Sequence, residues 1–366
     1  MKIIFNNTIF FSQKYGGISR YFSEIFKNLI KQKINFKIIS PIYKNIFLKN
    51  LEKKYKFGFY FPRYPLFKAF SKCNEYICNS IISQSKYTII HDTYYTYELS
   101  KIKNKKKIIT IHDLIHEKFS KYYNDFDNII DYKKKIFSNI DYFICVSENT
   151  KNDFLDIYKI SEDRVKVIHH GSDHLEEKLE NNEYYLKKDD SFSNKDFILY
   201  VGSRHRYKNF DLLLKAYNDK EKLHKNFNLI CFGGEKLNVQ EKKFIQKNNL
   251  QNKFFHIYGD DNLLKNLYSS ARVFVSTSIY EGFGLNVLEA MRYGCPVILN
   301  DIKVFRELFK NYPTYYNNKE SLIHNLNNIL IEDKNLKKDK INLINFSKSF
   351  TWTNTVNKTL DVYKSI

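Results

Sequence analysis

One stretch near the carboxyl end of the chain, residues 276–301, constrains the fold more than any other. A short apolar run at 273–275 leads into it and reads as a buried strand. A turn with two glycines, Gly282 and Gly284, follows, and then apolar residues at helical spacing. The apolar run that begins at Pro296 reads as the next strand. The order of strand, glycine turn, helix and strand predicts one unit of a parallel α/β sheet.

The turn in such a unit leaves the carboxyl end of a strand, where open α/β sheets bind ligands. It also feeds the amino end of a helix, whose backbone N–H groups have no partner inside the helix. Those of Gly284, Leu285 and Asn286 are suited to a phosphate or diphosphate, and no metal is needed. Because Gly282 and Gly284 have no Cβ atom, we expect them to let the ligand approach the backbone closely.

Two carboxylates complete this stretch, Glu281 in the turn and Glu289 in the helix, and each is suited to the hydroxyl groups of a sugar or ribose. With the glycines and the Gly-Cys-Pro exit they resemble the signature of the large retaining glycosyltransferase family with the GT-B fold, often called family 4 or glycosyl transferases group 1. The resemblance implies that Glu289 holds the nucleotide ribose and that Glu281 acts at the donor sugar, near the reacting carbon. An ordinary βαβ unit with two solvated acids is the alternative.

Strands and helices alternate in both halves of the 366 residues, which predicts an α/β protein with two Rossmann-like, doubly wound parallel sheets. A polar, charged stretch at 173–195 reads as an interdomain linker. We therefore place the first domain at 1–172 and the second, nucleotide-sugar-binding domain at 196–352. The resemblance implies that the domains face a cleft, with the first on the acceptor side, and that the helix at 353–366 returns to pack on the first domain.

Three basic residues, Arg204, Arg206 and Lys208, follow the apolar run that opens the second domain. Cations at a strand end are suited to a diphosphate leaving group, because negative charge grows on its oxygen as the sugar bond breaks. The resemblance implies that Arg204 and Lys208 do this work, with Arg206 as a substitute for Arg204. Solvated basic residues in a lysine-rich chain are the alternative.

In the first domain, Gly16 and Gly17 stand between an opening strand and an amphipathic helix. They resemble the family's amino-terminal glycine loop, which lies near the donor phosphate and the acceptor; a plain turn is the alternative. His112 follows a second buried strand and resembles a histidine that hydrogen-bonds the donor sugar or helps with charge at the reacting centre. We treat His112 and Glu281 as the catalytic candidates, although a single histidine is often structural.

Weaker candidates for acceptor contacts are His91, Asp92, His116 and Glu117, and the aromatic residues Tyr60, Phe61, Tyr64 and Phe67, for which core packing is the more ordinary interpretation. Residues 125–127 spell Asp-Phe-Asp, a pattern that binds a metal and a diphosphate in other glycosyltransferases. Because this pattern lies in a polar loop, we interpret it as chance and expect neither a metal nor another cofactor.

The formal net charge of +20 comes mostly from lysine. The lysines are scattered among acidic residues, which argues against a nucleic-acid-binding protein. Runs at 101–107 and 133–135 are suited either to an anionic membrane or to water. The five cysteines show no metal spacing and read as reduced core residues of a cytosolic protein. We found no apolar stretch that could span a membrane and no leader pattern, so we expect a cytoplasmic protein, in solution or peripheral on the membrane.

The resemblance implies transfer of a hexose, with retention, from a nucleotide diphosphate sugar to a hydroxyl of a glycan or lipid-linked glycan. The segments Gly-Gly-Ile-Ser-Arg-Tyr at 16–21 and His-Asp-Leu-Ile-His-Glu at 112–117 are most similar to bacterial mannosyltransferase-type members that build surface polysaccharide and lipopolysaccharide. They favour GDP-mannose as the donor. UDP-glucose or UDP-GlcNAc is the alternative donor, and a noncatalytic sugar-nucleotide-binding protein is the alternative function.

Overall fold

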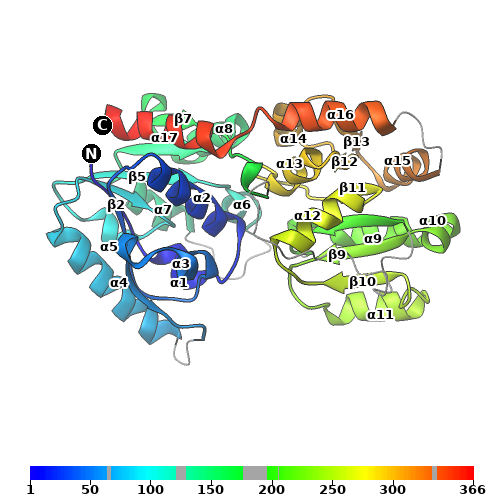
Figure 1. Ribbon diagram of the computed structural model, residues 1–366, viewed down its shortest axis with the longest axis horizontal. Helices are drawn as coiled ribbons and strands as arrows, with labels where there is room; N and C mark the ends of the chain where they lie inside the picture. The colour runs from blue at the N-terminus through cyan, green and yellow to red at the C-terminus, as the bar shows by residue number, and fades with distance from the viewer. Residues whose placement is uncertain (64–66, 121–128, 176–195, 205, 332–335) are drawn as a thin grey trace. The chain divides into compact units, whose positions relative to one another are not determined.

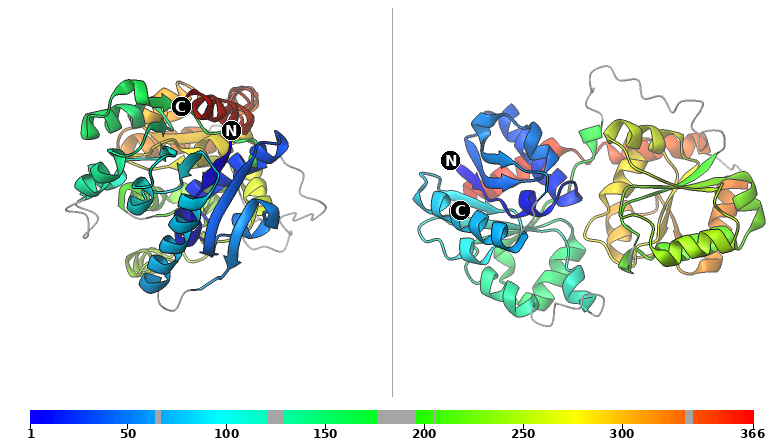
Figure 2. Two further views of the ribbon diagram at one scale, coloured as in Figure 1. Left: turned by 90° about the vertical axis from the view of Figure 1, so that its left-hand side faces the viewer. Right: turned by 90° about the horizontal axis from the view of Figure 1, so that it is seen from below.

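The computed structural model describes the chain except residues 64–66, 121–128, 176–195, 205 and 332–335. The chain divides into two compact units, one formed by Met1–Gly171 with Trp352–Ile366 and the other by Ser172–Thr351. Most of the linker expected at 173–195, residues 176–195, lies outside the described residues. Each unit is built on one parallel sheet with helices on both faces (Figures 1 and 2). The predicted fold class, two Rossmann-like α/β domains, is confirmed.

The sheet of the first unit has seven strands, and every neighbouring pair is parallel. In sheet order the strands are β3 (Lys56–Tyr60), β2 (Phe36–Tyr43), β1 (Ile3–Phe5), β4 (Ile89–Asp92), β5 (Lys106–Ile111), β6 (Tyr142–Cys145) and β7 (Val165–Val167). The chain order reverses between β1 and β4, which makes that gap the topological switch point of the sheet. Strand β7, at one edge of the sheet, has only three residues.

Helix α2 (Gly17–Lys31) shows how sequence periodicity builds the first core. Its buried residues include Tyr21, Phe22 and Phe26, which recur at helical spacing. The ring of Phe26 lies 4.9 Å from the ring of Phe5 on β1. Each such buried aromatic side chain contributes about 1.5–3 kcal/mol through removal of apolar surface from water.

The carboxyl-terminal helix α17 (Trp352–Ser365) belongs to the first unit and packs on α2 (Figure 1). The other described helices of this unit are α1 (Thr8–Ser12), α3 (Ile46–Asn50), α4 (Phe67–Gln84), α5 (Tyr97–Ser100), α6 (Ile115–Lys118), α7 (Ile129–Phe137) and α8 (Glu148–Tyr158), with short 3-10 turns η1 (Lys53–Tyr55) and η3 (Glu162–Arg164). Helix α8 begins at Glu148, because Ser147 caps its start by accepting from the N–H of Thr150.

The sheet of the second unit has six parallel strands. In sheet order they are β10 (Phe254–Ile257), β9 (Asn228–Phe232), β8 (Phe197–Val201), β11 (Val273–Ser276), β12 (Val297–Asn300) and β13 (Thr314–Tyr316). The chain order reverses between β8 and β11. The residues that follow these two strands are therefore the ones expected to bind a ligand.

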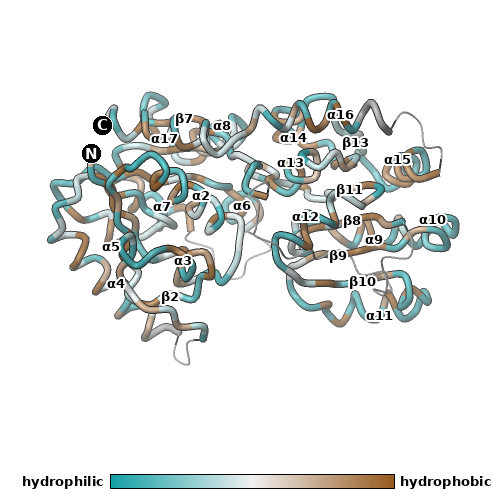
Figure 3. Tube along the Cα trace, in the orientation of Figure 1, coloured by the Kyte–Doolittle hydropathy of each residue, from teal (hydrophilic) through white to brown (hydrophobic). Residues whose placement is uncertain are grey.

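The core of the second unit lies between its sheet and helices α9 (Phe210–Asn218), α11 (Val239–Lys247) and α15 (Lys319–Ile331). Strand β8 is largely hydrophobic and the outer helix α10 (Glu221–Asn226) is hydrophilic (Figure 3). The remaining described helices are α12 (Asp261–Ser270), α13 (Leu285–Arg292), α14 (Lys303–Phe309) and α16 (Leu336–Ser347), with 3-10 turns η4 (Asp173–Leu175) and η5 (Arg206–Lys208). Helix α13 contacts α12, α16, β11 and β12.

The edge strand β3 and helix α4 are among the elements of the first unit that were not predicted from sequence. Strand β3 alternates between partly buried and exposed residues, and it runs so close to β2 that a Cβ atom on Gly58 would lie 1.7 Å from the carbonyl oxygen of Ser40. Register shifts between Ile39 and Ile42 at this edge. Pairing across the sheet, which sequence periodicity does not report, decides this region.

Four of the five cysteines are buried, but Cys73 is exposed, so the expectation that all are core residues is wrong for Cys73. Burial raises the pKa of the Cys78 and Cys295 thiols to about 12. Among the described helices, none combines the length and apolar character needed to cross a membrane.

Candidate functional site

The turns that follow β8 and β11 are hydrogen-bonded to each other at the switch point of the second sheet. The N–H of Ile279 donates to the carbonyl of Tyr207 at 2.8 Å, and the hydroxyl of Thr277 donates to the carbonyl of Lys208 at 2.7 Å. The amide of Asn300, at the end of β12, donates to the carbonyl of Ser278 at 3.0 Å. Two segments about 70 residues apart in sequence are thus held in one fixed arrangement.

A charged pair lies on this arrangement. Lys208 Nζ is 2.5 Å from Glu281 Oε1, and the hydroxyl of Ser278 donates to the same oxygen at 2.7 Å. The side chains of Lys208 and Glu281 are 17% and 12% exposed, so water screens the pair only in part. The structure therefore brings together two of the residues predicted from sequence, one for the diphosphate and one for the sugar.

The start of α13 lies beside the end of β8. The side-chain amide of Asn286 donates to the carbonyl of Val201 at 3.0 Å, which ties the first turn of the helix to the strand. Within the part of the chain that the structure describes, the backbone N–H groups of Gly284, Leu285 and Asn286 have no acceptor. They carry the partial positive charge of the helix end. Their role in binding a diphosphate stays a prediction.

Gly284 is needed for a reason other than the one expected. Its φ is +97°, in the left-handed region, and a Cβ atom there would lie 2.8 Å from the ring of Phe305 on α14. The space is filled by the protein and does not lie open to a ligand. The expectation that Gly284 clears room for the ligand is therefore wrong, because packing and backbone conformation already account for this glycine.

Glu289 is buried, and both of its carboxylate oxygens have a partner from elsewhere in the second unit. The hydroxyl of Tyr268 on α12 donates to Oε2 at 2.9 Å, and His174 Nε2 in η4 lies 3.0 Å from Oε1. Sequence reasoning missed Tyr268 and His174, because 21 and 115 residues separate them from Glu289 and no local pattern marks them. The hydrogen bond from Tyr268 orients the carboxylate predicted to hold the ribose, and His174 lies beside it.

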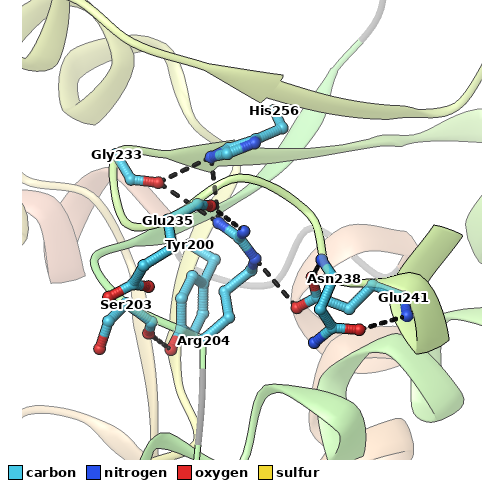
Figure 4. A network of polar contacts seen from close by, with 8 residues as sticks. All are labelled: Tyr200, Ser203, Arg204, Gly233, Glu235, Asn238, Glu241 and His256. Atoms are coloured by element: carbon cyan, nitrogen blue, oxygen red, sulfur yellow. Dashed lines mark hydrogen bonds and ion pairs between the residues drawn. The ribbon is translucent and has the colours of Figure 1, made fainter.

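Arg204 faces the turn after β9 (Figure 4). Its Nε donates to Glu241 Oε1 at 3.1 Å, its Nη1 lies 3.3 Å from the carbonyl oxygen of Gly233 and 3.0 Å from His256 Nε2, and its Nη2 donates to the carbonyl of Glu235. The side chain is 1% exposed. The structure thus gives Arg204 protein acceptors where the sequence predicts a diphosphate. Arg206, the sequence alternative, is exposed.

In the first unit, the two glycines after β1 differ in their surroundings. Gly17 begins α2, and a Cβ atom on it would meet nothing within 4 Å. A Cβ atom on Gly16 would lie 2.4 Å from Oε1 of Gln13. Open space beside the backbone is what a close ligand contact requires, and here Gly17 has it.

His112 follows β5, and its ring packs edge-on against the ring of Tyr21, with a centroid distance of 5.0 Å. Nε2 of His112 is buried and has no hydrogen-bond partner among the described residues. Burial lowers the pKa of His112 to about 3, and nearby His91 adds to this effect. At neutral pH the ring is therefore uncharged and able to form a hydrogen bond, but it is not a proton donor of ordinary acidity.

The weaker acceptor candidates have structural partners. Both ring nitrogens of His91 are engaged, Nδ1 with the Tyr363 hydroxyl at 2.6 Å and Nε2 with the Thr110 hydroxyl at 2.9 Å. Asp92 is buried and accepts from the side chain of Asn6 and from the backbone N–H of Thr96. These contacts lie at the end of β4, beside the switch point with β1. His91 and Asp92 are therefore core residues, and they are not exposed to a glycan acceptor.

The side chain of Glu117 is buried as well, which corrects two expectations. Its Oε1 accepts from Lys133 Nζ at 2.7 Å and from the Tyr158 hydroxyl at 2.6 Å. Lys133 is therefore part of the interior and not of a membrane-facing lysine run. Residues 125–127 lie outside the described residues, and so does Tyr64, one of the aromatic acceptor candidates.

The second unit thus places a cation, the amino end of a helix and two carboxylates around the switch point of a parallel sheet. Together with a second Rossmann-like unit, this arrangement defines the class of GT-B glycosyltransferases. Residues 15–174 match the model described as Glycosyltransferase Family 4, and residues 181–350 match Glycosyl transferases group 1. The chain belongs to this glycosyltransferase family, as predicted.

Known proteins are similar at modest identity. An uncharacterised glycosyltransferase of Methanocaldococcus jannaschii is 28% identical over 60% of this chain and 59% of its own length. The O-antigen chain mannosyltransferase RfbU of Salmonella typhimurium is 28% identical over 48% of this chain and 46% of its own. The chain thus spans about half the length of these curated relatives. The crystal structure of Anabaena HepE in complex with UDP-glucose superposes with a TM-score of 0.79 at 16% identity, covering 100% of both chains, which shows a common fold.

Proposed function

We propose that this glycosyltransferase moves a hexose, with retention at the anomeric carbon, from a nucleotide diphosphate sugar to a hydroxyl of a glycan or lipid-linked glycan in surface polysaccharide synthesis. The observation that carries the proposal is the contact between Lys208 and Glu281 beside the open N–H groups of α13. A donor needs positive charge at its diphosphate and a carboxylate at its sugar. The second unit supplies both at one place.

The groups divide naturally along a bound donor. The ammonium of Lys208 and the N–H groups of Gly284, Leu285 and Asn286 are suited to the diphosphate. Glu289, held by Tyr268 and His174, is suited to the ribose hydroxyls. Glu281 is suited to the sugar. In the free protein Glu281 neutralises Lys208, so we infer that a diphosphate competes with Glu281 for the ammonium and leaves the carboxylate to the sugar hydroxyls.

The proposed reaction breaks the bond between the anomeric carbon and the diphosphate oxygen and forms a bond from the acceptor oxygen on the same face. The acceptor proton passes to an oxygen of the leaving diphosphate, so no protein base is assigned. Lys208 and the helix end stabilise the negative charge of the leaving group. Glu281 stabilises the positive charge that develops on the sugar. His112 serves as a neutral hydrogen-bonding group for the sugar. No metal enters this proposal.

GDP-mannose is the first donor to test. RfbU, a relative with 28% identity, is named as a mannosyltransferase, which supports this choice. HepE was crystallised with UDP-glucose, so a UDP-linked sugar is the second donor to test. Neither similarity identifies the nucleotide base of the donor that this chain binds.

The experiment is a thermal melt of the purified chain with GDP, UDP, ADP and their sugar conjugates, with EDTA present and then with Mn²⁺ added. A ligand that binds only the folded state raises the melting temperature, by an amount that corresponds to about 2.7 kcal/mol at 100 times its Kd. We expect one nucleotide to stand out in EDTA. Binding that appears only with Mn²⁺ would overturn the metal-free reaction, and no shift with any nucleotide in a folded protein would overturn donor binding altogether.

A turnover assay distinguishes the enzyme from the noncatalytic sugar-nucleotide-binding protein. Incubation of the chain with the nucleotide sugar that shifts the melt, and with a panel of glycan and lipid-linked acceptors, should release the free nucleoside diphosphate. Binding without release on any acceptor or on water favours a sugar-nucleotide-binding protein. Membership of the glycosyltransferase family favours the enzyme over the binding protein.

We also propose peripheral attachment to an anionic membrane. Basic residues and Asp141 line an open groove of about 790 Å³ at the amino ends of β5, β6 and β7; the basic ones are Lys103, Lys105, Lys106, Lys107 and Arg164. Part of this charge is already used, since Lys105 Nζ donates to the carbonyls of Ser85 and Tyr87. Sedimentation with anionic vesicles at low salt should fall when Lys103 and Lys106 are changed to Glu. Equal sedimentation of that variant and of Lys225→Glu would remove the groove from the proposal.

A further inference from the structure

Arg204, in the turn after β8, lies in a buried network of polar contacts (Figure 4). The network joins this turn to the turn after β9 and to the start of α11. The Arg204 guanidinium reaches the turn that follows β9, at Gly233 and Glu235, and the start of α11, at Glu241. All three of its nitrogens have partners there. Glu241 is itself held, because its Oε2 accepts from the backbone N–H of Asn238 at 2.8 Å in a capping box.

The turn after β9 is one that needs such support. Gly233 and Gly234 both have positive φ, +72° and +71°, so the backbone turns sharply there. A Cβ atom on Gly234 would lie 2.4 Å from the carbonyl oxygen of Gly202, in the turn after β8. By contrast, Cβ atoms on Gly202 and Gly233 would meet nothing within 4 Å. The two turns lie close together at Gly234, and the space beside Gly202 and Gly233 is open.

That open space lies at the carboxyl ends of β8 and β9, next to the switch point that holds Lys208. The side chain of Arg204, by contrast, is only 1% exposed. Its N–H groups face backbone carbonyls and Glu241. A residue so placed acts on the shape of the glycine-lined space rather than on a molecule inside it.

We propose that Arg204 is a positioning residue: with Glu241 it holds the Gly233–Glu235 turn against the turn after β8 and so shapes the surface that receives the nucleotide diphosphate. The diphosphate charge is then met by Lys208 and the start of α13, without Arg204. This inference rests on donor binding by the second unit, as proposed above. It also assigns one shared role to Arg204 and Glu241. A direct contact between Arg204 and the diphosphate would give Glu241 no part in that role.

The shared role is testable in a double-mutant cycle of Arg204→Met and Glu241→Gln. A glutamine at position 241 keeps the capping box, because it can accept the same bond from Asn238, but it no longer offers a charge to Arg204. We expect each single variant to weaken binding of the stabilising nucleoside diphosphate about tenfold, and the double variant to weaken it no further, because contacting residues are not additive. The donor KM should rise while kcat at saturating donor stays within about threefold.

The matched control is Arg306→Met, which removes an exposed arginine that bonds both oxygens of Asp301. It should leave affinity and KM unchanged. If Arg204→Met abolishes turnover at saturating donor while Glu241→Gln behaves as wild type, Arg204 acts on the substrate directly and the inference is wrong.

A second measurement needs no ligand and keeps this inference separate from donor binding. Hydrogen exchange of the backbone amides at 233–237 should speed up in both Arg204→Met and Glu241→Gln, and not in Arg306→Met. Unchanged exchange in a folded Arg204→Met protein would overturn the positioning role even if nucleotides bind. Faster exchange in a chain that binds no nucleotide would leave the positioning of the turn standing and overturn the proposed function instead.

Discussion

Lys208 Nζ lies 2.5 Å from Glu281 Oε1 and thereby joins the turn after β8 to the turn after β11 across the switch point of the second sheet. Two hydroxyls from the turn after β11 hold the pair in place. Thr277 donates to the carbonyl of Lys208, and Ser278 donates to the carboxylate of Glu281. In the free protein each charge is satisfied by the other. Substitution of either partner should therefore affect nucleotide binding and catalysis in different ways.

Lys208→Met should weaken binding of the nucleoside diphosphate, because it removes the cation from the proposed diphosphate site. Charge-assisted hydrogen bonds of this kind contribute about 1.5–3 kcal/mol, so a loss of roughly 10- to 100-fold in affinity is expected by titration calorimetry. The matched control is Lys225→Met, which removes an exposed lysine 2.5 Å from Glu221. Equal affinities of the two variants would rule out Lys208 as a diphosphate ligand.

Glu281→Gln should separate binding from turnover. Because the neutral amide no longer competes for Lys208, affinity for the nucleoside diphosphate without sugar should stay the same or rise. Turnover should fall about 100-fold or more, since the variant loses the negative charge that is proposed to act at the reacting sugar. The exposed Glu320→Gln is the control for turnover. Near-normal turnover of Glu281→Gln would refute its catalytic role.

His112→Gln should lower turnover about tenfold, the equivalent of one lost hydrogen bond of roughly 1.4 kcal/mol. The pKa of His112 is lowered to about 3 by burial, so the ring stays neutral above pH 5 and the pH–rate profile of the wild type should show no step from this residue between pH 6 and 8. Steady-state rates across that range test both statements, with the exposed His324→Gln as control. A step near pH 6.5 that disappears in His112→Gln would contradict the neutral role.

Gly17→Ala and Gly16→Ala should have opposite effects. The first fills open space at the start of α2 and should leave the melting temperature unchanged or raise it slightly, because Ala exceeds Gly in helix propensity by up to about 1 kcal/mol. It should nevertheless reduce transfer if a substrate approaches this turn. Gly16→Ala displaces the side chain of Gln13 and should lower the melting temperature. Full transfer by Gly17→Ala would show that no substrate comes close.

The first unit should lose stability as the pH falls from 7.5 to 5.5. Burial lowers the pKa of His91 to about 3, well below that of a histidine in the unfolded chain, so below about pH 6.5 the unfolded state binds a proton that the folded state does not. The free energy of unfolding then falls by up to about 1.4 kcal/mol per pH unit for each such histidine. Burial raises the pKa of Asp92 and Asp113, which acts in the opposite direction at lower pH, so the range stops at 5.5.

His91→Gln should be less stable than wild type at pH 7.5, because it loses ring contacts with Tyr363 and Thr110, but its stability should depend less on pH. Denaturant unfolding at several pH values measures both effects. An unchanged slope in His91→Gln would show that His91 is not the titrating group.

The sequence was informative where a site is built from neighbours along the chain. The turn and helix at 281–289 follow a strand, and strand order places such turns at the ligand-binding edge. Apolar runs likewise predicted the strands on either side, β11 and β12. Lys208 and Glu281 were each predicted from their own segments, although 73 residues separate them. Their contact could not be predicted, since it depends on which strands become neighbours.

By itself, then, the sequence determined the fold class, the family and the turns that form the site, because hydrophobic periodicity and glycine positions are local properties of the chain. Only the tertiary structure decided which side chains serve ligands and which serve the protein. Arg204, His91 and Glu117 are polar residues near strand ends, yet buried partners hold each of them. Burial and partner distance arise when distant segments pack together, and a buried polar group needs a partner that no local pattern announces.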